Sequence, residues 1–311
     1  MTTDIAAIVT DIATQVARDA ARIEADADAK DDTLGPGPFG IAVALLDGRI
    51  LSAGAADAGF PIQSIAKVFA LDCALDAEGD DLFARVGREP SGDPFNSIVD
   101  LERTKGIPRN PFINAGALVI VDVLVERCGD DRRSSTVVDL VRRETDGAEV
   151  PLDEDVLASE REAGDLNRAM MSFLKHHENL RSEPDDVMEA YIHQCAITLD
   201  CRGLARAGRF LAETAPSDDP AADARAQRMR RLCALMMTCG HYDGSGDFAY
   251  RVGLPAKSGV GGGILAVIPG VGAAAVWSPN LDQQGNSMQG VRALEMLAAR
   301  TGWSVFGPRG G

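Results

Sequence analysis

Residues 39–54 read FGIAVALLDGRILSAG, and residues 254–278 read LPAKSGVGGGILAVIPGVGAAAVWS. Each stretch contains short apolar runs separated by Asp-Gly, Pro-Gly or glycine-rich turns, which is the pattern of β-hairpins. Because two strands alone bury too little apolar surface, we expect both stretches to join in one antiparallel sheet. The sheet is therefore predicted to be built from both ends of the chain.

Helical patterns surround and separate these strands. Apolar residues recur at helical spacing from residue 4 to about residue 29, and a last helix is expected over residues 286–300. From residue 64 to about residue 237, one helical pattern follows another with few strand-like runs. The fold class is thus predicted as α+β, with terminal helices on the sheet. We expect a single domain over residues 1–311, with an α/β lobe from about 1–63 and 241–311 and a helical lobe from about 64–240.

Composition argues against several classes of partner. The chain has 31 basic and 47 acidic side chains, a net charge of -16, which disfavours nucleic acid and anionic membranes as partners. It has neither an apolar stretch of membrane-spanning length nor the basic-then-apolar start of an export signal. The six cysteines form no C-x-x-C pair, which favours buried reduced thiols over disulfides or zinc. We expect a cytoplasmic protein without a metal or organic cofactor.

Ser64 and Lys67 lie at the start of the predicted helical lobe, in the sequence FPIQSIAKVF. Side chains three residues apart share one face of a helix, so the lysine amine could accept the serine hydroxyl proton. This S-x-x-K arrangement is typical of an acylating serine. It also arises by chance, and a capping serine followed by a lysine that reaches solvent is the alternative.

A second motif, Lys257-Ser258-Gly259, follows the helical region on a predicted strand. The K-[ST]-G form accompanies S-x-x-K in serine β-lactamases and penicillin-binding proteins. A strand edge of this kind can present a backbone N–H to an oxyanion, while Lys257 adds positive potential. The alternative is an edge strand kinked by its glycines. The chain has only five lysines, so two of them in paired motifs favour the catalytic interpretation.

The chain resembles the serine-dependent glutaminase family in five strings that occur in this order: PIQSIAKVF, NPFINAGALV, SEREAGDLNRA, YIHQCAI and TCGHYDGSGDFAYRVGLPAKSGVGGGI. The resemblance runs from about Phe39 to Trp277. It implies a serine β-lactamase-like fold, a homodimer or homotetramer, and hydrolysis of free L-glutamine to L-glutamate and ammonia through a serine acyl-enzyme. One departure is the absence of the family's Tyr-Ile-Pro motif before the first strand, where residues 23–38 read IEADADAKDDTLGPGP.

The resemblance also implies the catalytic roles. Ser64 would be the nucleophile, Lys67 its proton acceptor and Tyr242 a relay for the proton, with Lys257 beside them. The backbone N–H groups of Ser64 and Val260 would form the oxyanion hole. The substrate would be held by Gln63, Ser64, Asn114, Glu160, Asn167, Tyr191, Tyr242 and Val260.

The chemistry of a free amino acid agrees with these positions. Its ammonium needs a carboxylate, which Glu160 supplies, and its carboxylate needs donors such as the amides of Asn114 and Asn167 or the hydroxyl of Tyr191. Taken without the resemblance, Glu160 could be a solvated charge in an acidic loop, and Tyr191 a core aromatic residue on an amphipathic helix.

Two other functions remain open from the sequence. A β-lactamase or D-alanyl peptidase would share the two lysine motifs, but this chain has Asn114-Ala-Gly where a β-lactamase has Ser-x-Asn. A catalytically weak or silent amino-acid-binding protein is suggested by the absent tyrosine motif. An ammonia assay would separate an enzyme from a binding protein.

Overall fold

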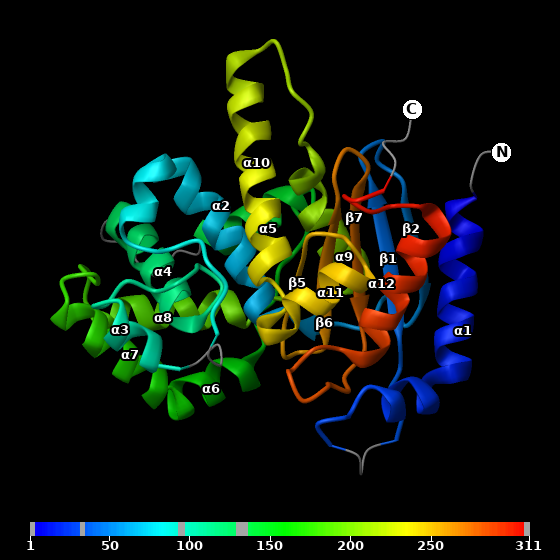
Figure 1. The fold of residues 1–311 in the computed structure, drawn as a ribbon, viewed down its shortest axis with the longest axis horizontal. Helices are drawn as coiled ribbons and strands as arrows, with labels where there is room; N and C mark the ends of the chain where they lie inside the picture. Colours follow the sequence, from blue (N-terminus) through cyan, green and yellow to red (C-terminus); the bar gives the residue numbers. More distant parts are fainter. Residues whose placement is uncertain (1–3, 32–34, 93–96, 129–135, 308–311) are drawn as a thin grey trace. The chain divides into compact units, whose positions relative to one another are not determined.

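The computed structural model describes residues 4–31, 35–92, 97–128 and 136–307. The chain forms two compact units, a sheet unit of Met1–Phe60 with Leu199–Gly311, and a helical unit of Pro61–Thr198 (Figure 1). Two short strands, β3 (Phe60–Pro61) and β4 (Thr198–Leu199), form a two-stranded sheet that contains both boundaries.

The second boundary differs from the expected one near residue 240. Helix α9 (Cys201–Gly208) packs on β1 and β7, and helix α10 (Pro220–Cys239) contacts β5, so both belong to the sheet unit. Helical periodicity shows that a helix has an apolar face, but it does not show which core covers that face. The helical pattern alone therefore predicts α9 and α10 as part of the helical lobe, whereas in the structure they belong to the sheet unit.

The sheet unit contains a five-stranded antiparallel sheet in the order β2-β1-β7-β6-β5. Strand β1 pairs with its hairpin partner β2 on one side and with β7 on the other, so that Ala42 lies opposite both Ser52 and Ala275. The prediction of one sheet built from both chain ends is confirmed. The strands span Gly40–Leu45 (β1), Ile50–Gly54 (β2), Ala256–Ser258 (β5), Gly263–Ile268 (β6) and Gly272–Trp277 (β7).

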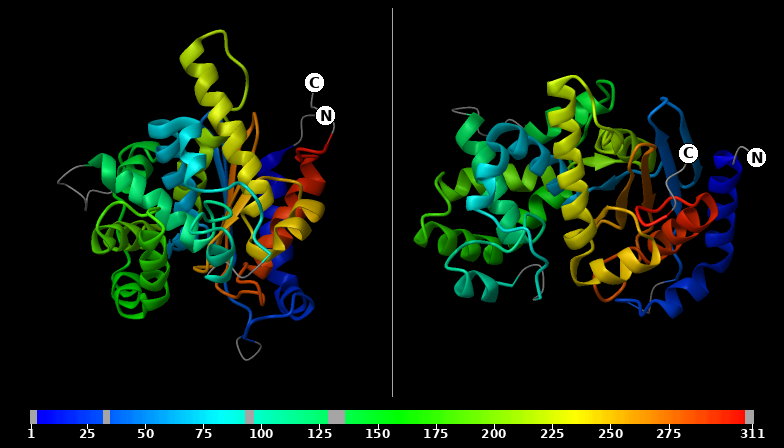
Figure 2. Two further views of the ribbon diagram at one scale, coloured as in Figure 1. Left: turned by 60° about the vertical axis from the view of Figure 1, so that its left-hand side comes forward. Right: turned by 45° about the horizontal axis from the view of Figure 1, so that its top comes forward.

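Helices cover both faces of this sheet. Helix α1 (Ile5–Asp26) and helix α12 (Met288–Thr301) lie side by side on one face, as Figures 1 and 2 show, and pack against Ile41 and Val43. On the other face, Leu265 of β6 lies against Gly208 of α9, which has no room for a larger side chain. Two covered faces explain why β1, β6 and β7 are almost continuously apolar.

The rest of the sheet unit comprises 3-10 helices η3 (Arg209–Ala212) and η4 (Tyr242–Gly244) and helix α11 (Ser245–Arg251). The helical unit contains η1 (Gln63–Ile65), α2 (Ala66–Glu78), η2 (Gly79–Ala84), α3 (Val99–Arg103), α4 (Asn114–Cys128), α5 (Thr136–Glu144), α6 (Glu154–Ala163), α7 (Asp165–His176) and α8 (Pro184–Cys195).

The core of the helical unit lies among α4, α7 and α8. Helix α4 begins NAGALVIVDVLV and is apolar on nearly all sides, as expected of a helix enclosed by others. Helix α2 packs on α4 and is buried from Ala66 to Asp72. The side chains that these two helices carry are therefore held in a rigid, enclosed setting.

The fold is α+β with a central helical region, as the sequence predicts. Within the described ranges, no helix combines the length and the apolar character needed to cross a membrane.

Candidate active site

Ser64 and Lys67 lie at the start of α2. Ser64 belongs to the 3-10 turn η1 and Lys67 to the first turn of α2, and they are 8% and 1% exposed. The N-cap of α2 is Ile65, without a side-chain cap, so Ser64 does not cap this helix. Because Lys67 is also buried, the interpretation as a capping serine followed by a solvent-reaching lysine is wrong.

The backbone before Ser64 is strained. Gln63 has φ 49°, a left-handed conformation that non-glycine residues seldom adopt. Tyr242 has φ 52°, so two of the predicted site residues share this uncommon conformation. Such strain persists where the surrounding structure imposes it, and it gathers at functional sites.

Lys67 is held by two neutral acceptors. Its Nζ donates to Asn114 Oδ1 at 2.7 Å and to the Phe112 carbonyl oxygen at 3.2 Å. Burial lowers the pKa of Lys67 to about 8, against the opposing influence of Cys195 and Glu160. A large fraction of the amine is therefore neutral near pH 8 and able to accept a proton.

Asn114 connects Lys67 to two other predicted residues. Its Nδ2 donates to Asn167 Oδ1 at 3.2 Å, and its Oδ1 accepts from the Tyr191 hydroxyl at 3.5 Å. Tyr191 packs in the helical core, yet its ring centroid lies 6.0 Å from Lys67 Nζ. Tyr191 is thus a core aromatic whose hydroxyl reaches the polar cluster. The cluster joins α2, α4, α7 and α8.

Glu160 on α6 is partly buried. Burial raises its pKa, and Lys67 acts in the opposite direction. A carboxylate that interacts with a buried lysine is not a solvated charge in a loop. Glu160 is a partly buried helical residue, and its role toward the substrate stays a prediction.

Three predicted residues lie together in the sheet unit. Lys257 in β5 is fully buried, with Nζ 4.4 Å from the Tyr242 ring centroid, and it donates to the Ser258 carbonyl oxygen. The Tyr242 hydroxyl donates to the same oxygen at 3.3 Å. Val260 and Tyr242 both lie beside Gly285. A Cβ placed there would lie 3.6 Å from Val260 Cγ1 and 3.8 Å from Tyr242 Cε2, so Val260 lies close to Tyr242.

The glycines after Val260 allow a close backbone approach. Gly262 has φ 90°, and a Cβ there would lie 2.3 Å from the Ser278 carbonyl oxygen. Ser278 N donates to the Gly262 carbonyl oxygen at 3.1 Å. Gly262 therefore permits the close approach of the backbone at Ser278.

The predicted residues thus form one group in each unit. In the helical unit, contacts or electrostatic influence join Lys67, Asn114, Glu160, Asn167 and Tyr191. Gln63 and Ser64 precede Lys67 in the adjoining turn. The second group consists of Tyr242, Lys257 and Val260.

Two further residues beside these groups are not predicted from the sequence. Cys195 influences Lys67, and burial raises its pKa to about 12. It lies four residues after Tyr191 on α8, and this helical spacing could have indicated its position. His241 stacks on Phe248 with ring centroids 3.7 Å apart, and burial, then Lys257, lowers its pKa to about 3. Nothing in the sequence indicated that this neutral histidine lies near Lys257.

The described residues offer no group of three or more His, Cys, Asp or Glu side chains arranged to hold a metal ion. The thiols of Cys195, Cys201 and Cys233 are free, and the side chain of Cys128 lies outside the described residues.

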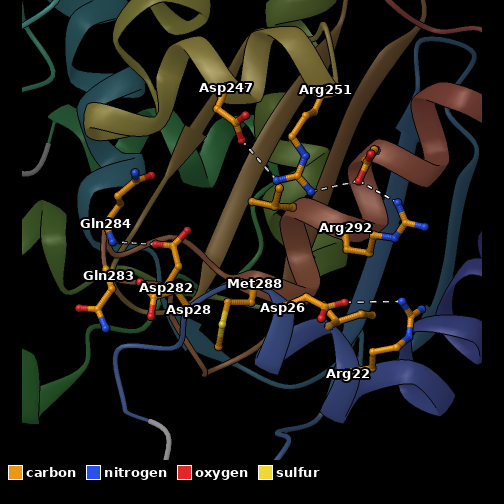
Figure 3. A pocket seen from close by; sticks show the side chains of 14 residues that line it. Arg22, Asp26, Asp28, Asp247, Arg251, Asp282, Gln283, Gln284, Met288 and Arg292 are labelled. Carbon is orange, nitrogen blue, oxygen red and sulfur yellow. Dashed lines mark hydrogen bonds and ion pairs between the residues drawn. The ribbon is translucent and has the colours of Figure 1, made fainter.

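A cavity of about 600 Å³ in the sheet unit has a different lining. It lies between the end of α1, α11, α12 and residues 282–284, and no predicted site residue lines it. Several of its charged groups pair with one another: Arg251 bonds to Asp247 and Glu295, and Arg292 to Glu295 (Figure 3). The cavity is therefore not the predicted active site.

Comparison with known proteins agrees with this description. The structure of a probable glutaminase from Bacillus subtilis matches with a TM-score of 0.82 and 31% identity, covering 95% of this chain and 97% of that one. The covalent complex of the Bacillus subtilis glutaminase YbgJ with 5-oxo-L-norleucine, formed by reaction with 6-diazo-5-oxo-L-norleucine, matches with a TM-score of 0.78 and 28% identity, covering 97% and 100%. The fold is that of the serine β-lactamase-like class.

The sequence comparisons narrow that class. A glutaminase from Rhizobium rhizogenes is 52% identical over 275 residues, which is 88% of each chain. The family model described as Glutaminase matches residues 32–306. The chain belongs to the glutaminase family.

Proposed function

We propose that this protein hydrolyses the side-chain amide of free L-glutamine to L-glutamate and ammonia through an acyl-enzyme on Ser64. The observation that carries this proposal is the cluster around Lys67. A buried lysine with a pKa near 8 lies three residues after a serine and bonds to Asn114, which contacts Asn167 and Tyr191. Membership of the glutaminase family supports the choice of substrate.

The proposal requires the two units to act as one catalytic domain. Ser64 and Lys67 belong to the helical unit, while Tyr242, Lys257 and Val260 belong to the sheet unit. Each group has its own buried lysine and its own strained residue, Gln63 or Tyr242. We assign the nucleophile and its base to the first group, and the proton relay and one oxyanion donor to the second.

Acylation begins when Ser64 Oγ attacks the side-chain amide carbon and its proton passes to neutral Lys67. The amide oxygen becomes an oxyanion that the backbone N–H groups of Ser64 and Val260 stabilise, an effect worth about 10²–10³ in rate for one donor. The C–N bond then breaks, and the departing nitrogen takes a proton from Lys67 through Tyr242 and leaves as ammonia. A positioned proton carrier contributes about 10²–10⁴.

Deacylation repeats these steps with water. Lys67, neutral again, takes a proton from water as its oxygen attacks the ester carbon. Collapse of the second tetrahedral intermediate releases L-glutamate and returns the proton to Ser64 Oγ. Neither half-reaction changes the oxidation state of any atom.

Substrate recognition follows from charge. Glu160 pairs with the substrate ammonium, while Asn114, Asn167 and Tyr191 donate to its carboxylate, with Gln63 and Tyr242 beside the reacting amide. Burying either charge of the amino acid without a partner costs several kcal/mol, about as much as binding provides. In a glutamine-containing dipeptide, a peptide bond replaces one of these two charged groups of glutamine, so the dipeptide should be a poor substrate.

The protein is also proposed to act in the cytoplasm as a homodimer or homotetramer. The free thiols of Cys195, Cys201 and Cys233 support a reducing compartment. The oligomer follows from the family resemblance, and light scattering after size-exclusion chromatography measures it.

The direct test of the activity is ammonia release from L-glutamine, L-asparagine and a glutamine-containing dipeptide. We expect glutamine to be the preferred substrate and Ser64→Ala to lose at least about 10³ in kcat. Ser172→Ala, at an exposed serine on α7, is the matched control and should keep wild-type activity. Near wild-type turnover by Ser64→Ala would refute the proposal.

A further inference from the structure

Asn110 is a buried residue outside the set assigned to catalysis. It is 1% exposed and makes three hydrogen bonds. Its Oδ1 accepts from Phe112 N at 2.9 Å and from Ile113 N at 3.1 Å, and its Nδ2 donates to the Glu89 carbonyl oxygen at 2.9 Å. Its side chain thus determines the path of the backbone that leads into α4.

The bond to Ile113 N has a consequence for Lys67. Ile113 N–H and the Phe112 carbonyl belong to one planar trans peptide group, in which they point in opposite directions. When Asn110 holds the N–H, the carbonyl must point the other way. That carbonyl oxygen accepts from Lys67 Nζ at 3.2 Å. Asn110 and Lys67 therefore bind opposite edges of the same peptide group.

The start of α4 packs tightly on Asn110. A Cβ at Gly116 would lie 1.9 Å from the Asn110 carbonyl oxygen, so only glycine permits this approach. Asn114, the first residue of α4, supplies the second acceptor for Lys67. Both acceptors of the lysine are therefore within four residues of Asn110.

We propose that Asn110 is a positioning residue for the proton acceptor, because it fixes the peptide group between Phe112 and Ile113 so that the Phe112 carbonyl oxygen orients the Lys67 amine. The proposal deepens the proposed function and rests on it, since the role of Lys67 belongs to that function. Asn110 itself need not touch the substrate.

The consequence for the amine has two parts. The carbonyl orients one N–H of Lys67, and it stabilises the ammonium form against burial. The other titratable groups that act on Lys67 are Glu160 on α6 and Cys195 and Tyr191 on α8. Loss of the carbonyl should therefore misalign the amine and lower its pKa further. Activity should fall while the pH at half-maximal kcat/KM moves down.

The experiment compares Asn110→Ala with Asn179→Ala. Asn179 is also a buried asparagine of the helical unit, 8% exposed, and it bonds to Arg85 and to the Gly106 carbonyl oxygen, away from Lys67. We expect Asn110→Ala to lose about 10² in maximal kcat/KM. The pH at half-maximal kcat/KM, called the midpoint below, should move to lower pH. Asn179→Ala should lose stability and keep the wild-type midpoint. An unchanged midpoint in Asn110→Ala, with activity lost only in proportion to unfolded protein, overturns the proposal.

A second variant covers the case in which Asn110→Ala does not fold. Asn110→Asp keeps the acceptor for both N–H groups and places a negative charge near Lys67. It should keep activity within about tenfold of wild type and move the midpoint to higher pH, because the charge favours the ammonium. A midpoint equal to that of the wild type overturns the proposal.

A crystal structure of Asn110→Ala or Asn110→Asp gives a reading independent of catalysis. We expect the Phe112 carbonyl oxygen to leave Lys67 Nζ in the alanine variant and to stay in the aspartate variant. A carbonyl that stays in the alanine variant overturns the positioning role, whatever the activity. Failure of the proposed function is recognised separately, from ammonia release by Ser64→Ala.

Discussion

Lys67 Nζ donates to Asn114 Oδ1 at 2.7 Å, although the two residues are 47 positions apart in the chain. The contact fixes the orientation of the Asn114 amide, with the oxygen toward Lys67 and the nitrogen toward Asn167 Oδ1. The amide oxygen is a neutral acceptor, so it favours the ammonium form of the lysine less than a carboxylate would. The lysine therefore stays available as a base.

The pH dependence of catalysis should reflect this arrangement. With a Lys67 pKa of about 8, kcat/KM should rise from pH 7 to pH 9 as the amine loses its proton. Asn114→Asp places a carboxylate beside the ammonium, so the midpoint should move up by at least about one pH unit. Ammonia release measured from pH 6 to pH 10 checks both. An Asn114→Asp midpoint at or below that of wild type would contradict the assignment of Lys67 as the base.

The same group should also make the free energy of unfolding depend on pH. The folded pKa of Lys67 is lowered from 10.5 to about 8, so the unfolded chain binds the proton more tightly between these pH values. Stability from this group is therefore lowest below pH 8 and rises toward pH 10.5, by about 3 kcal/mol in total.

Lys67→Met tests this linkage, because it removes the titration. We expect it to be more stable than wild type at pH 7, although the Phe112 carbonyl and Asn114 lose a donor, and to lose that advantage by pH 10. Urea unfolding at both pH values gives the difference. A difference that does not depend on pH would show that burial does not perturb Lys67.

His241 should govern stability in mild acid. Its pKa is lowered from 6.5 to about 3, so its contribution is complete above pH 6.5 and is lost as the pH falls toward 3. The slope is about 1.4 kcal/mol per pH unit within this window. His241→Phe keeps the stacking on Phe248 and should flatten the slope between pH 6 and pH 4.

Unfolding free energies of His241→Phe at pH 7, 6, 5 and 4 measure that slope. The exposed His176 at the end of α7 provides the control, since His176→Asn should keep the wild-type slope. Equal slopes in wild type and His241→Phe would exclude His241 as the cause.

Glu24 should stabilise the sheet unit. The carboxylate is 7% exposed and accepts from Asn280 Nδ2 at 2.8 Å and from Gln289 Nε2 at 2.6 Å. Glu24→Ala leaves both amides without this acceptor and should lower the free energy of unfolding by about 2–4 kcal/mol. Asp26→Ala, which removes only an exposed ion pair with Arg22 (Figure 3), should change it by less than about 1 kcal/mol. Comparable losses in chemical denaturation would contradict this role.

The sequence predicts the parts of the fold that depend on local pattern. The alternation of turns and apolar runs predicts where the strands lie. Strands β1 and β7 are apolar on both faces, which agrees with their pairing inside the sheet. The pattern of α9 and α10 is as helical as that of α2, so it could not show that the sheet covers their apolar faces. That choice depends on tertiary packing.

The same distinction applies to the site. The spacing of Ser64 and Lys67 is a property of one helical turn, so their proximity can be predicted from the sequence. The contact of Lys67 with the Phe112 carbonyl involves a backbone atom, so no residue type in the sequence marks it. A third case is the segment of residues 23–38, where the family's tyrosine motif is absent. The side-chain amides of Asn280 and Gln289 donate to the carbonyl oxygens of Gly35 and Gly37 in this segment. No sequence pattern of asparagine and glutamine predicts these hydrogen bonds.

The most direct test of the central claim is covalent labelling with 6-diazo-5-oxo-L-norleucine, the reagent that forms a covalent complex with the Bacillus subtilis glutaminase YbgJ. Intact mass and peptide mapping of the labelled protein locate the modified residue. We expect one adduct on Ser64, absent in Ser64→Ala and formed much more slowly in Lys67→Met. An adduct on another residue, or equal labelling of Ser64→Ala, would contradict it.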